Sequence, residues 1–157
     1  MYTVYQWYHP SMAVNPTALL HEFKAREARE HWKDILDLAE AGAVAVVRRN
    51  SPVAVIDRQV LDDALAKVHP FNVQVSFGQG EVSTWIEGLP VHGIGASLDE
   101  SEDDFLDALL DYAEAWVEEL HVAPNHRGHA GVVRRVLLCA GDREQLRRTV
   151  FPEADSE

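Results

Sequence analysis

Two adjacent arginines, Arg48 and Arg49, are the residues of this chain best suited to bind an anion. A guanidinium group presents a planar fork of N–H donors, which fits a phosphate group or the edge of a guanine base. The flanking stretches, residues 44–47 and 53–56, are rich in valine and typical of strands, and Asn50 between them tolerates a left-handed backbone. The sequence therefore predicts a β-hairpin with a cationic tip.

Further cations precede this hairpin and lie near the start of an expected helix; they are Lys24, Arg26, Arg29 and Lys33. Cations in the first half of a helix can follow a phosphate backbone, so we expect these residues and the hairpin tip to contact DNA. One subunit offers few contacts, whereas a two-fold dimer would double them and match a palindromic site. Composition alone leaves ordinary surface cations as the alternative.

A helix from about Leu19 to Ala41 is expected to position these cations. Apolar residues recur along it, mostly at intervals of three and four, at Phe23, Ala28, Trp32, Ile35, Leu36 and Ala39. Gly42 is placed to end the helix in a left-handed conformation. A second helix is expected from about Arg58 to Val68, and the apolar faces of both helices are expected to form the dimer interface. Residues 1–17 fit either an edge strand or a loosely held arm.

The second half of the chain predicts three strands followed by helices. Alternating apolar residues indicate strands near residues 71–77 and 81–87, with a turn at Gly78-Gln79-Gly80, and a third strand near 93–98. A long helix is expected to begin at about Asp99, where Ser101 and Asp104 resemble a capping box. Its expected buried face contains Phe105, Leu106, Leu109, Leu110, Ala113, Trp116, Val117 and Leu120. Two shorter helices, near residues 130–139 and 142–150, are expected to follow.

The charge of the chain is distributed unevenly. The net charge of −12 is carried by residues 68–123, which contain 12 Asp and Glu and no Lys or Arg. Such a surface repels nucleic acid and attracts a basic protein, although a solvated helix face is an equally simple explanation. The acids expected to meet a partner lie on the outer side of the long helix, at Asp103, Asp107, Asp111, Glu114 and Glu118.

The remaining candidates for chemistry favour no enzyme, metal or cofactor. Asp99, Asp103, Asp104 and Asp107 share one exposed helix and lack a converging partner, as solvated caps do. His121, His126 and His129 fit polar loop residues better than a zinc site. Cys139 is alone and is expected to be a buried small residue. No apolar run suits a membrane span and no secretion signal is visible, so a cytoplasmic protein is expected.

The last two helices carry five arginines: Arg134, Arg135, Arg143, Arg147 and Arg148. These helices could form a small helix-turn-helix with Gly141 at the turn. They could equally form a helical hairpin that covers the sheet and faces the acidic helix. The second arrangement is favoured because neutralising carboxylates lie close at hand.

Residues from about Thr17 to Leu65 resemble the prevent-host-death (Phd/YefM) antitoxin family. The matching residues are Ala28-Arg29, Ile35-Leu36, Gly42, Val44 to Val47, Arg48-Arg49, Pro52-Val53-Ala54-Val55, and Val60 to Leu65. The resemblance implies a dimer that binds its own operator through the start of the first helix and the basic turn. It also implies no enzymatic activity. The chain departs from the family pattern at Glu30 to Trp32 and at Asn50.

Residues 71–120 are similar, through their element order and Gly88-Leu89-Pro90, to the HicB-like antitoxin domain. If so, the acidic block would belong to a toxin-neutralising half. The expected protein is α+β, with a DNA-binding and dimerisation domain at 1–68, an α+β domain at 69–151 and a tail at 152–157. The expected function is that of an antitoxin and autorepressor in a bacterial type II toxin–antitoxin pair. Its partners would be a basic toxin, operator DNA and a second copy. The alternative is an acidic module that sequesters a basic protein without binding DNA.

Overall fold

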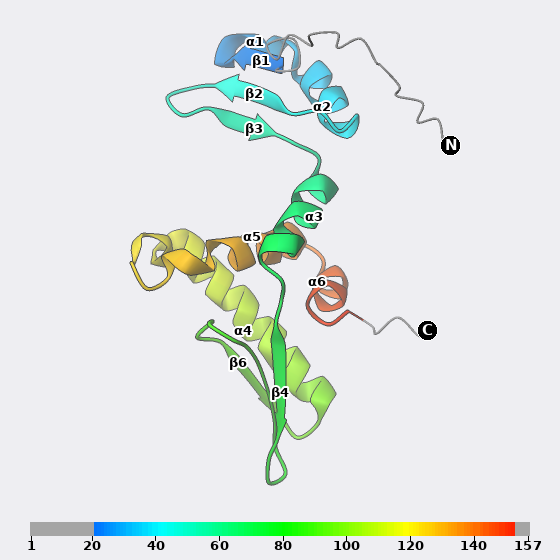
Figure 1. Cartoon of the computed structure of the whole chain (residues 1–157), viewed down its shortest axis with the longest axis vertical. Helices are drawn as coiled ribbons and strands as arrows, with labels where there is room; N and C mark the ends of the chain where they lie inside the picture. The colour runs from blue at the N-terminus through cyan, green and yellow to red at the C-terminus, as the bar shows by residue number, and fades with distance from the viewer. Residues whose placement is uncertain (1–20, 153–157) are drawn as a thin grey trace, which may run out of the picture. The chain divides into compact units, whose positions relative to one another are not determined.

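The computed structural model describes residues 21–152 and combines helices with two three-stranded sheets (Figure 1). The chain divides into two compact units, Met1–Asp57 and Arg58–Glu157. This division falls about one helix earlier than the boundary expected after residue 68. The expected N-terminal arm and all of the expected tail except Pro152 lie outside the described residues.

The first unit contains a mixed sheet of three strands in the order β1-β2-β3, formed by His21–Lys24, Ala45–Arg48 and Val53–Val55. The predicted hairpin is confirmed, because β2 and β3 are antiparallel with Ala45 opposite Val55. Strand β1 pairs in parallel with β2, with Lys24 opposite Arg48. The connection between parallel strands must cross over the sheet, and here it does so through helices.

The single helix expected from Leu19 to Ala41 is wrong. The structure places strand β1 first, then helix α1 (Ala25–Glu30) and helix α2 (Trp32–Glu40), with a kink at His31. Phe23, which the spacing assigned to the helical stripe, lies in β1, because parallel pairing with β2 overrides the local periodicity. The end of the expected helix is confirmed, since Gly42 has a φ of 82°.

Among residues 21–57, the buried core of the first unit is small. Its buried apolar cluster consists of Ala28, Ile35 and Ala45, with Phe23, Val47 and Val55 packed partly against it. Larger apolar side chains remain exposed around it; they are Trp32, Leu36, Val44 and Val53. A unit of this size buries little apolar surface alone.

The second unit begins with helix α3 (Arg58–Val68), whose bounds match the prediction. This helix packs against α5 (Ala130–Cys139), which is why it groups with the second half of the chain. Arg135 of α5 fixes the contact. Its side chain is buried, bonds to Asp62 of α3 and to the carbonyl oxygen of His69, and lies over the ring of Phe71.

The second sheet is the predicted antiparallel meander of β4 (Val73–Phe77), β5 (Val82–Ile86) and β6 (His92–Gly95). Residues of β5 alternate between buried and half-buried, as one covered face requires. The predicted turn between β4 and β5 is confirmed, and Gly80 there has a φ of 84°. Phe77, at the end of edge strand β4, is 73% exposed.

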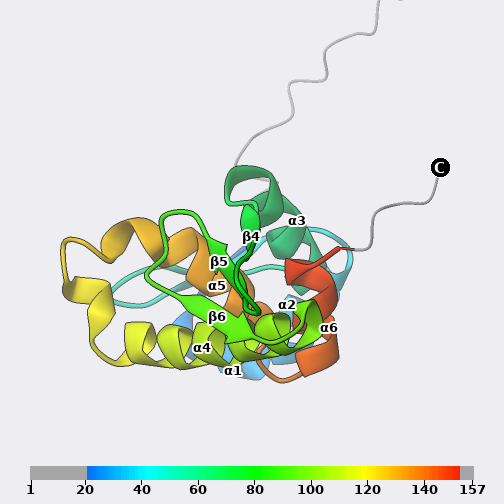
Figure 2. The same cartoon turned by 90° about the horizontal axis from the view of Figure 1, so that it is seen from below.

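Helix α4 (Leu98–Glu118) lies alongside β6 and packs on the covered face of the sheet (Figure 2). A Cβ atom on Gly93 would overlap the backbone of Ser101 and Phe105, so the helix approaches the strand at a glycine. The capping box expected at Ser101 and Asp104 is wrong. Ser97 caps the helix by accepting a bond from the N–H of Glu100, while Ser101 is buried.

Helix α6 (Arg143–Val150) and α5 complete the core of the second unit. Fully or nearly fully buried residues from all three last helices share this core, including Phe105, Leu106 and Leu109 of α4, Val133, Val136 and Cys139 of α5, and Leu146 and Val150 of α6. The expectation that Cys139 is buried is therefore confirmed. Within residues 21–152, no helix combines the length and apolar character that crossing a bilayer requires.

Candidate functional site

The two hairpin arginines differ in their surroundings. Arg48 ends strand β2, and its Nε lies 2.8 Å from Oε1 of Glu22 on the neighbouring strand β1. The hydrogen bond from Arg48 to Glu22, together with the attraction of that carboxylate, raises the pKa of the guanidinium group. The side chain of Arg48 is still 66% exposed. The pair therefore ties Arg48 to β1 while leaving most of its side chain exposed to solvent.

Arg49 occupies the turn itself. Among residues 21–152, no hydrogen bond or ion pair involves its side chain. It lines an open hollow of about 420 Å³ together with Asn50, Ser51, Val53 and Ala25, the first residue of α1. The hairpin turn and the start of α1 thus lie on the same side of the first unit, as DNA contact by both would require.

The four other cations expected to contact DNA are placed differently from one another. Lys24 pairs with Arg48 in the sheet register, and Arg26 follows on α1. Arg29 lies beside Trp32 and Val47 in a second shallow hollow. Lys33 lies beyond the kink, and its Nζ is 2.7 Å from Asp37, whose hydrogen bond raises the pKa of the lysine. The structure therefore groups Lys24 with the arginines of the hairpin and sets Lys33 apart on α2.

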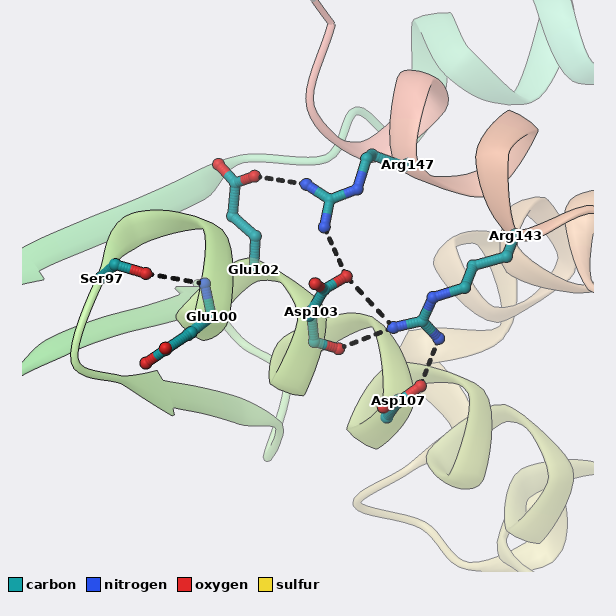
Figure 3. Close-up of polar contacts among 7 residues, drawn as sticks. All are labelled: Ser97, Glu100, Glu102, Asp103, Asp107, Arg143 and Arg147. Carbon is teal, nitrogen blue, oxygen red and sulfur yellow. Dashed lines mark hydrogen bonds and ion pairs between the residues drawn. The ribbon is translucent and has the colours of Figure 1, made fainter.

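Three acids in the first half of helix α4, Glu102, Asp103 and Asp107, are paired with two arginines of α6 (Figure 3). Arg147 of α6 donates to Asp103 at 2.6 Å and to Glu102 at 2.7 Å. Arg143 pairs with Asp107 and with Asp103. The hydrogen bonds from Arg147 and Arg143 lower the pKa of Asp103. The expectation that C-terminal arginines face the acidic helix is confirmed for these two.

The remaining arginines of that group have other roles. Arg135 joins α5 to α3, as described above, and Arg148 pairs with Glu144 of its own helix at 3.5 Å. Arg134 is exposed on α5. The structure favours the second alternative for the last helices, in which they face the acidic helix, because α5 and α6 pack with α4 around one core.

The second half of α4 carries acids without such partners. None of the hydrogen bonds or ion pairs within residues 21–152 involves the side chains of Asp111, Glu114 or Glu118. These acids border an open groove of about 530 Å³ between α4 and α5, whose apolar lining comes from Leu110, Ala113, Val117, Leu137 and Ala140. Val117 was expected in the core but is 51% exposed, so the apolar stripe of the helix continues past the core into this groove.

The histidines that follow α4 form hydrogen bonds through their rings. Tyr112 Oη lies 2.8 Å from Nδ1 of His126 and also bonds to Nδ1 of His129. Burial and the neighbouring His126 lower the pKa of His129. His121 bonds instead to the carbonyl oxygen of Trp116. Within the described part of the chain, no group of His, Cys, Asp and Glu is arranged to hold a metal ion.

A family model, PHD_like, matches residues 19–150 and is described as the antitoxin of a RelE/RelB toxin–antitoxin system. The chain belongs to this antitoxin family. The match spans residues of both units, from the hairpin of the first to the last helix of the second.

The fold is also similar to that of a solved protein. A crystal structure from Syntrophomonas wolfei subsp. wolfei, described as the antitoxin part of a candidate toxin/antitoxin system, superposes with a TM-score of 0.67 at 21% sequence identity. The alignment covers 83% of this chain and 96% of that chain. No curated protein matches the sequence.

Proposed function

We propose that this chain is the antitoxin of a bacterial type II toxin–antitoxin pair, which neutralises its toxin by direct binding and represses its own operon in the cytoplasm. The observation that carries the proposal is the match of an antitoxin family over residues 19–150. An antitoxin needs a surface for its toxin and no catalytic centre of its own. A non-enzymatic role fits the acids of α4, which lie on one exposed helix.

DNA binding is proposed for the first unit. Arg48 and Arg49 stand at the end of a hairpin, and Lys24 lies opposite Arg48 in the sheet. The first unit, residues 1–57, contains six Lys and Arg against seven Asp and Glu, whereas residues 68–123 contain 12 Asp and Glu and no Lys or Arg. DNA would therefore approach the first unit, because phosphates are repelled by the acidic one. This assignment follows the resemblance of the first unit to Phd/YefM antitoxins.

A homodimer is proposed to form through the first unit. Among residues 21–57, three buried residues form its apolar cluster, while Trp32 is 52% and Val53 is 50% exposed. A second copy that covered such side chains would remove apolar surface from water at about 25 cal/mol per Å². It would also bring a second pair of hairpin arginines to the same duplex.

The toxin-binding part of the proposal is tested by growth. The protein encoded by the gene adjacent to this one would be expressed from an inducible promoter, with and without the full chain. We expect the adjacent product to arrest growth alone, and co-expression to restore growth through a complex that survives purification. An adjacent product that arrests growth equally in both cultures would reject the antitoxin assignment.

The DNA-binding part is tested by a gel shift with the duplex upstream of the chain's own gene. We expect wild type to shift the duplex at low salt, and Arg48→Ala with Arg49→Ala to abolish the shift. Lys67→Ala is the matched control, because it removes an exposed cation from the second unit.

The alternative, an acidic module that sequesters a basic partner, is favoured by the unpaired acids on α4. It predicts a toxin complex but no shifted duplex. The two experiments together therefore separate an antitoxin that represses its operon from one that only binds protein.

A further inference from the structure

Helix α4 carries two kinds of acidic residue. Asp103 and Asp107 are paired with arginines of α6 and contribute to holding the fold together. Asp111, Glu114 and Glu118 follow on the same helix at intervals of three and four, and within residues 21–152 they have no ion-pair partner. These three acids of the second half of α4 therefore carry negative charge that no Lys or Arg among residues 21–152 pairs with.

This uncompensated charge borders apolar surface. Leu110, Ala113 and Val117 of α4 face Leu137 of α5 and Ala140, the residue that follows α5, across a groove of about 530 Å³. Val117 and Leu137 are 51% and 40% exposed, although both belong to helices whose other apolar residues fill the core. An exposed apolar strip bordered by charge is typical of a protein-binding site.

We propose that this groove binds an amphipathic helix of the toxin, with apolar residues on one face and Lys or Arg along its edge. The proposal rests on the toxin-binding function proposed above and assigns that function to one surface. The apolar side chains of the bound helix would pack on Val117 and Leu137. Its cations would pair with Asp111, Glu114 and Glu118.

The dimensions of the groove favour a helix. Its α4 wall runs from Leu110 to Glu118, which is about 12 Å at 1.5 Å per residue, or roughly two helical turns. Residues of a bound helix at positions i, i+4 and i+7 would reach successive positions of this wall. No charged residue of α5 lines the groove, so its carboxylates meet no competing cation within the groove.

Charge complementarity selects the chemistry of the partner. Residues 68–123 contain no Lys or Arg, so an approaching basic helix meets attraction along the whole segment. An acidic helix of the same shape would be repelled. Exposed ion pairs weaken as salt screens them, so affinity at this groove should fall as the salt concentration rises.

The test uses the full chain and the protein encoded by the adjacent gene, with the dissociation constant measured by calorimetry at low and high salt. The groove variants are Glu114→Lys with Glu118→Lys, and separately Val117→Arg. The matched controls are Glu81→Lys, an exposed acid in the β4–β5 turn, and Phe77→Ser, an exposed apolar residue on β4. Urea denaturation of every variant checks that the fold is retained.

We expect each groove variant to weaken binding at least about tenfold at low salt, with both controls within about twofold of wild type. If the groove variants fold and bind the toxin as tightly as wild type does, the groove is not the toxin-binding site, although the antitoxin function still stands. If Phe77→Ser loses binding instead, the toxin binds at the edge strand β4 and the groove proposal is wrong. If the wild-type chain does not bind the protein encoded by the adjacent gene, the proposed toxin-binding function is wrong, and the inference that rests on it is wrong as well.

A second probe needs no toxin. A synthetic helical peptide with leucines on one face and lysines at its edges should bind wild type and lose affinity for the groove variants. The same peptide with glutamates in place of lysines should not bind. If the lysine peptide binds wild type and the double variant Glu114→Lys with Glu118→Lys with equal affinity, the groove does not bind basic helices and the proposal is wrong.

Discussion

Arg147 donates a hydrogen bond to Asp103 at 2.6 Å, joining residues that lie 44 positions apart in the sequence. The same guanidinium group also reaches Glu102, so a single arginine of α6 pairs with two acids near the start of α4. This contact joins the first half of the acidic helix to α6.

The first prediction concerns the pH dependence of stability. The hydrogen bonds from Arg147 and Arg143 lower the pKa of Asp103 below its usual 3.8 in the folded chain. The folded state therefore binds a proton at Asp103 less readily than the unfolded state does. The stabilisation is complete above about pH 3.8 and is lost as the pH falls through the lower, folded pKa.

Asp103→Asn should accordingly be less stable than wild type at neutral pH, and the difference should shrink as the medium becomes acidic. Urea denaturation over a series of pH values measures this difference. Asp111→Asn is the matched control, since it changes an acid of the same helix that has no ion-pair partner among residues 21–152. Parallel curves for Asp103→Asn and wild type at all pH values would contradict the prediction.

The second prediction concerns Arg135, whose side chain is 7% exposed. Its Nε lies 3.3 Å from Asp62, its Nη1 lies 3.1 Å from the carbonyl oxygen of His69, and its guanidinium carbon lies 4.3 Å from the centre of the Phe71 ring. Removing one partner of a buried ion pair leaves the other uncompensated. Arg135→Ala should therefore lower the free energy of unfolding by about 3 kcal/mol.

Arg134→Ala is the control for this substitution, because it changes the adjacent but exposed arginine of α5. It should alter the free energy of unfolding by less than about 0.5 kcal/mol. Equal effects of the two substitutions in urea denaturation would show that Arg135 does not hold α3 against α5.

The third prediction concerns the contact between α4 and β6. A Cβ atom on Gly93 would overlap the carbonyl oxygen of Ser101 and the backbone nitrogen of Phe105, and rigid backbone atoms cannot rotate away as a flexible side chain can. Gly93→Ala should therefore destabilise the second unit by about 3 kcal/mol or more. Gly128→Ala, where an added Cβ meets no atom within 4 Å, should stay within about 1 kcal/mol of wild type. Thermal unfolding followed by circular dichroism compares the two.

Local patterns in the sequence predicted most of the elements. The bounds of α3 match the expected 58–68, and the hairpin, the antiparallel meander and the last helices follow from alternation, periodicity and glycine turns. These features depend on neighbouring residues, so the sequence displays them directly.

Features set by distant residues were not predictable in the same way. Strand β1 exists because it pairs with β2 across the sheet, and nothing in His21-Glu22-Phe23-Lys24 itself distinguishes a strand from the first turn of a helix. Ser101 looked like a helix cap, yet it is buried against Thr84 of β5 at 2.7 Å. The periodicity of α4 correctly placed Val117 on the apolar face of the helix. It could not show whether this part of the face is buried in the core or lines the groove.

The candidate DNA site was predictable only in part. The hairpin arginines and their exposure follow from the valine-rich flanks and the turn residues. The ion pair of Arg48 with Glu22 was not predictable, because it depends on the parallel pairing of β1 with β2. The structure thereby distinguishes an arginine held by a carboxylate from Arg49, whose side chain has no such bond among the described residues.

The most direct test of the proposed repressor is the salt dependence of DNA binding. Fluorescence anisotropy of a labelled duplex from upstream of the gene would give the binding constant of the full chain at several salt concentrations. We predict that wild type binds with a steep negative slope of log K against log salt, and that Arg48→Ala with Arg49→Ala flattens this slope by about 0.9 for each phosphate contact removed. Lys67→Ala should keep the wild-type slope. A wild-type chain that fails to bind at low salt, or an arginine variant with unchanged affinity and slope, would contradict the account.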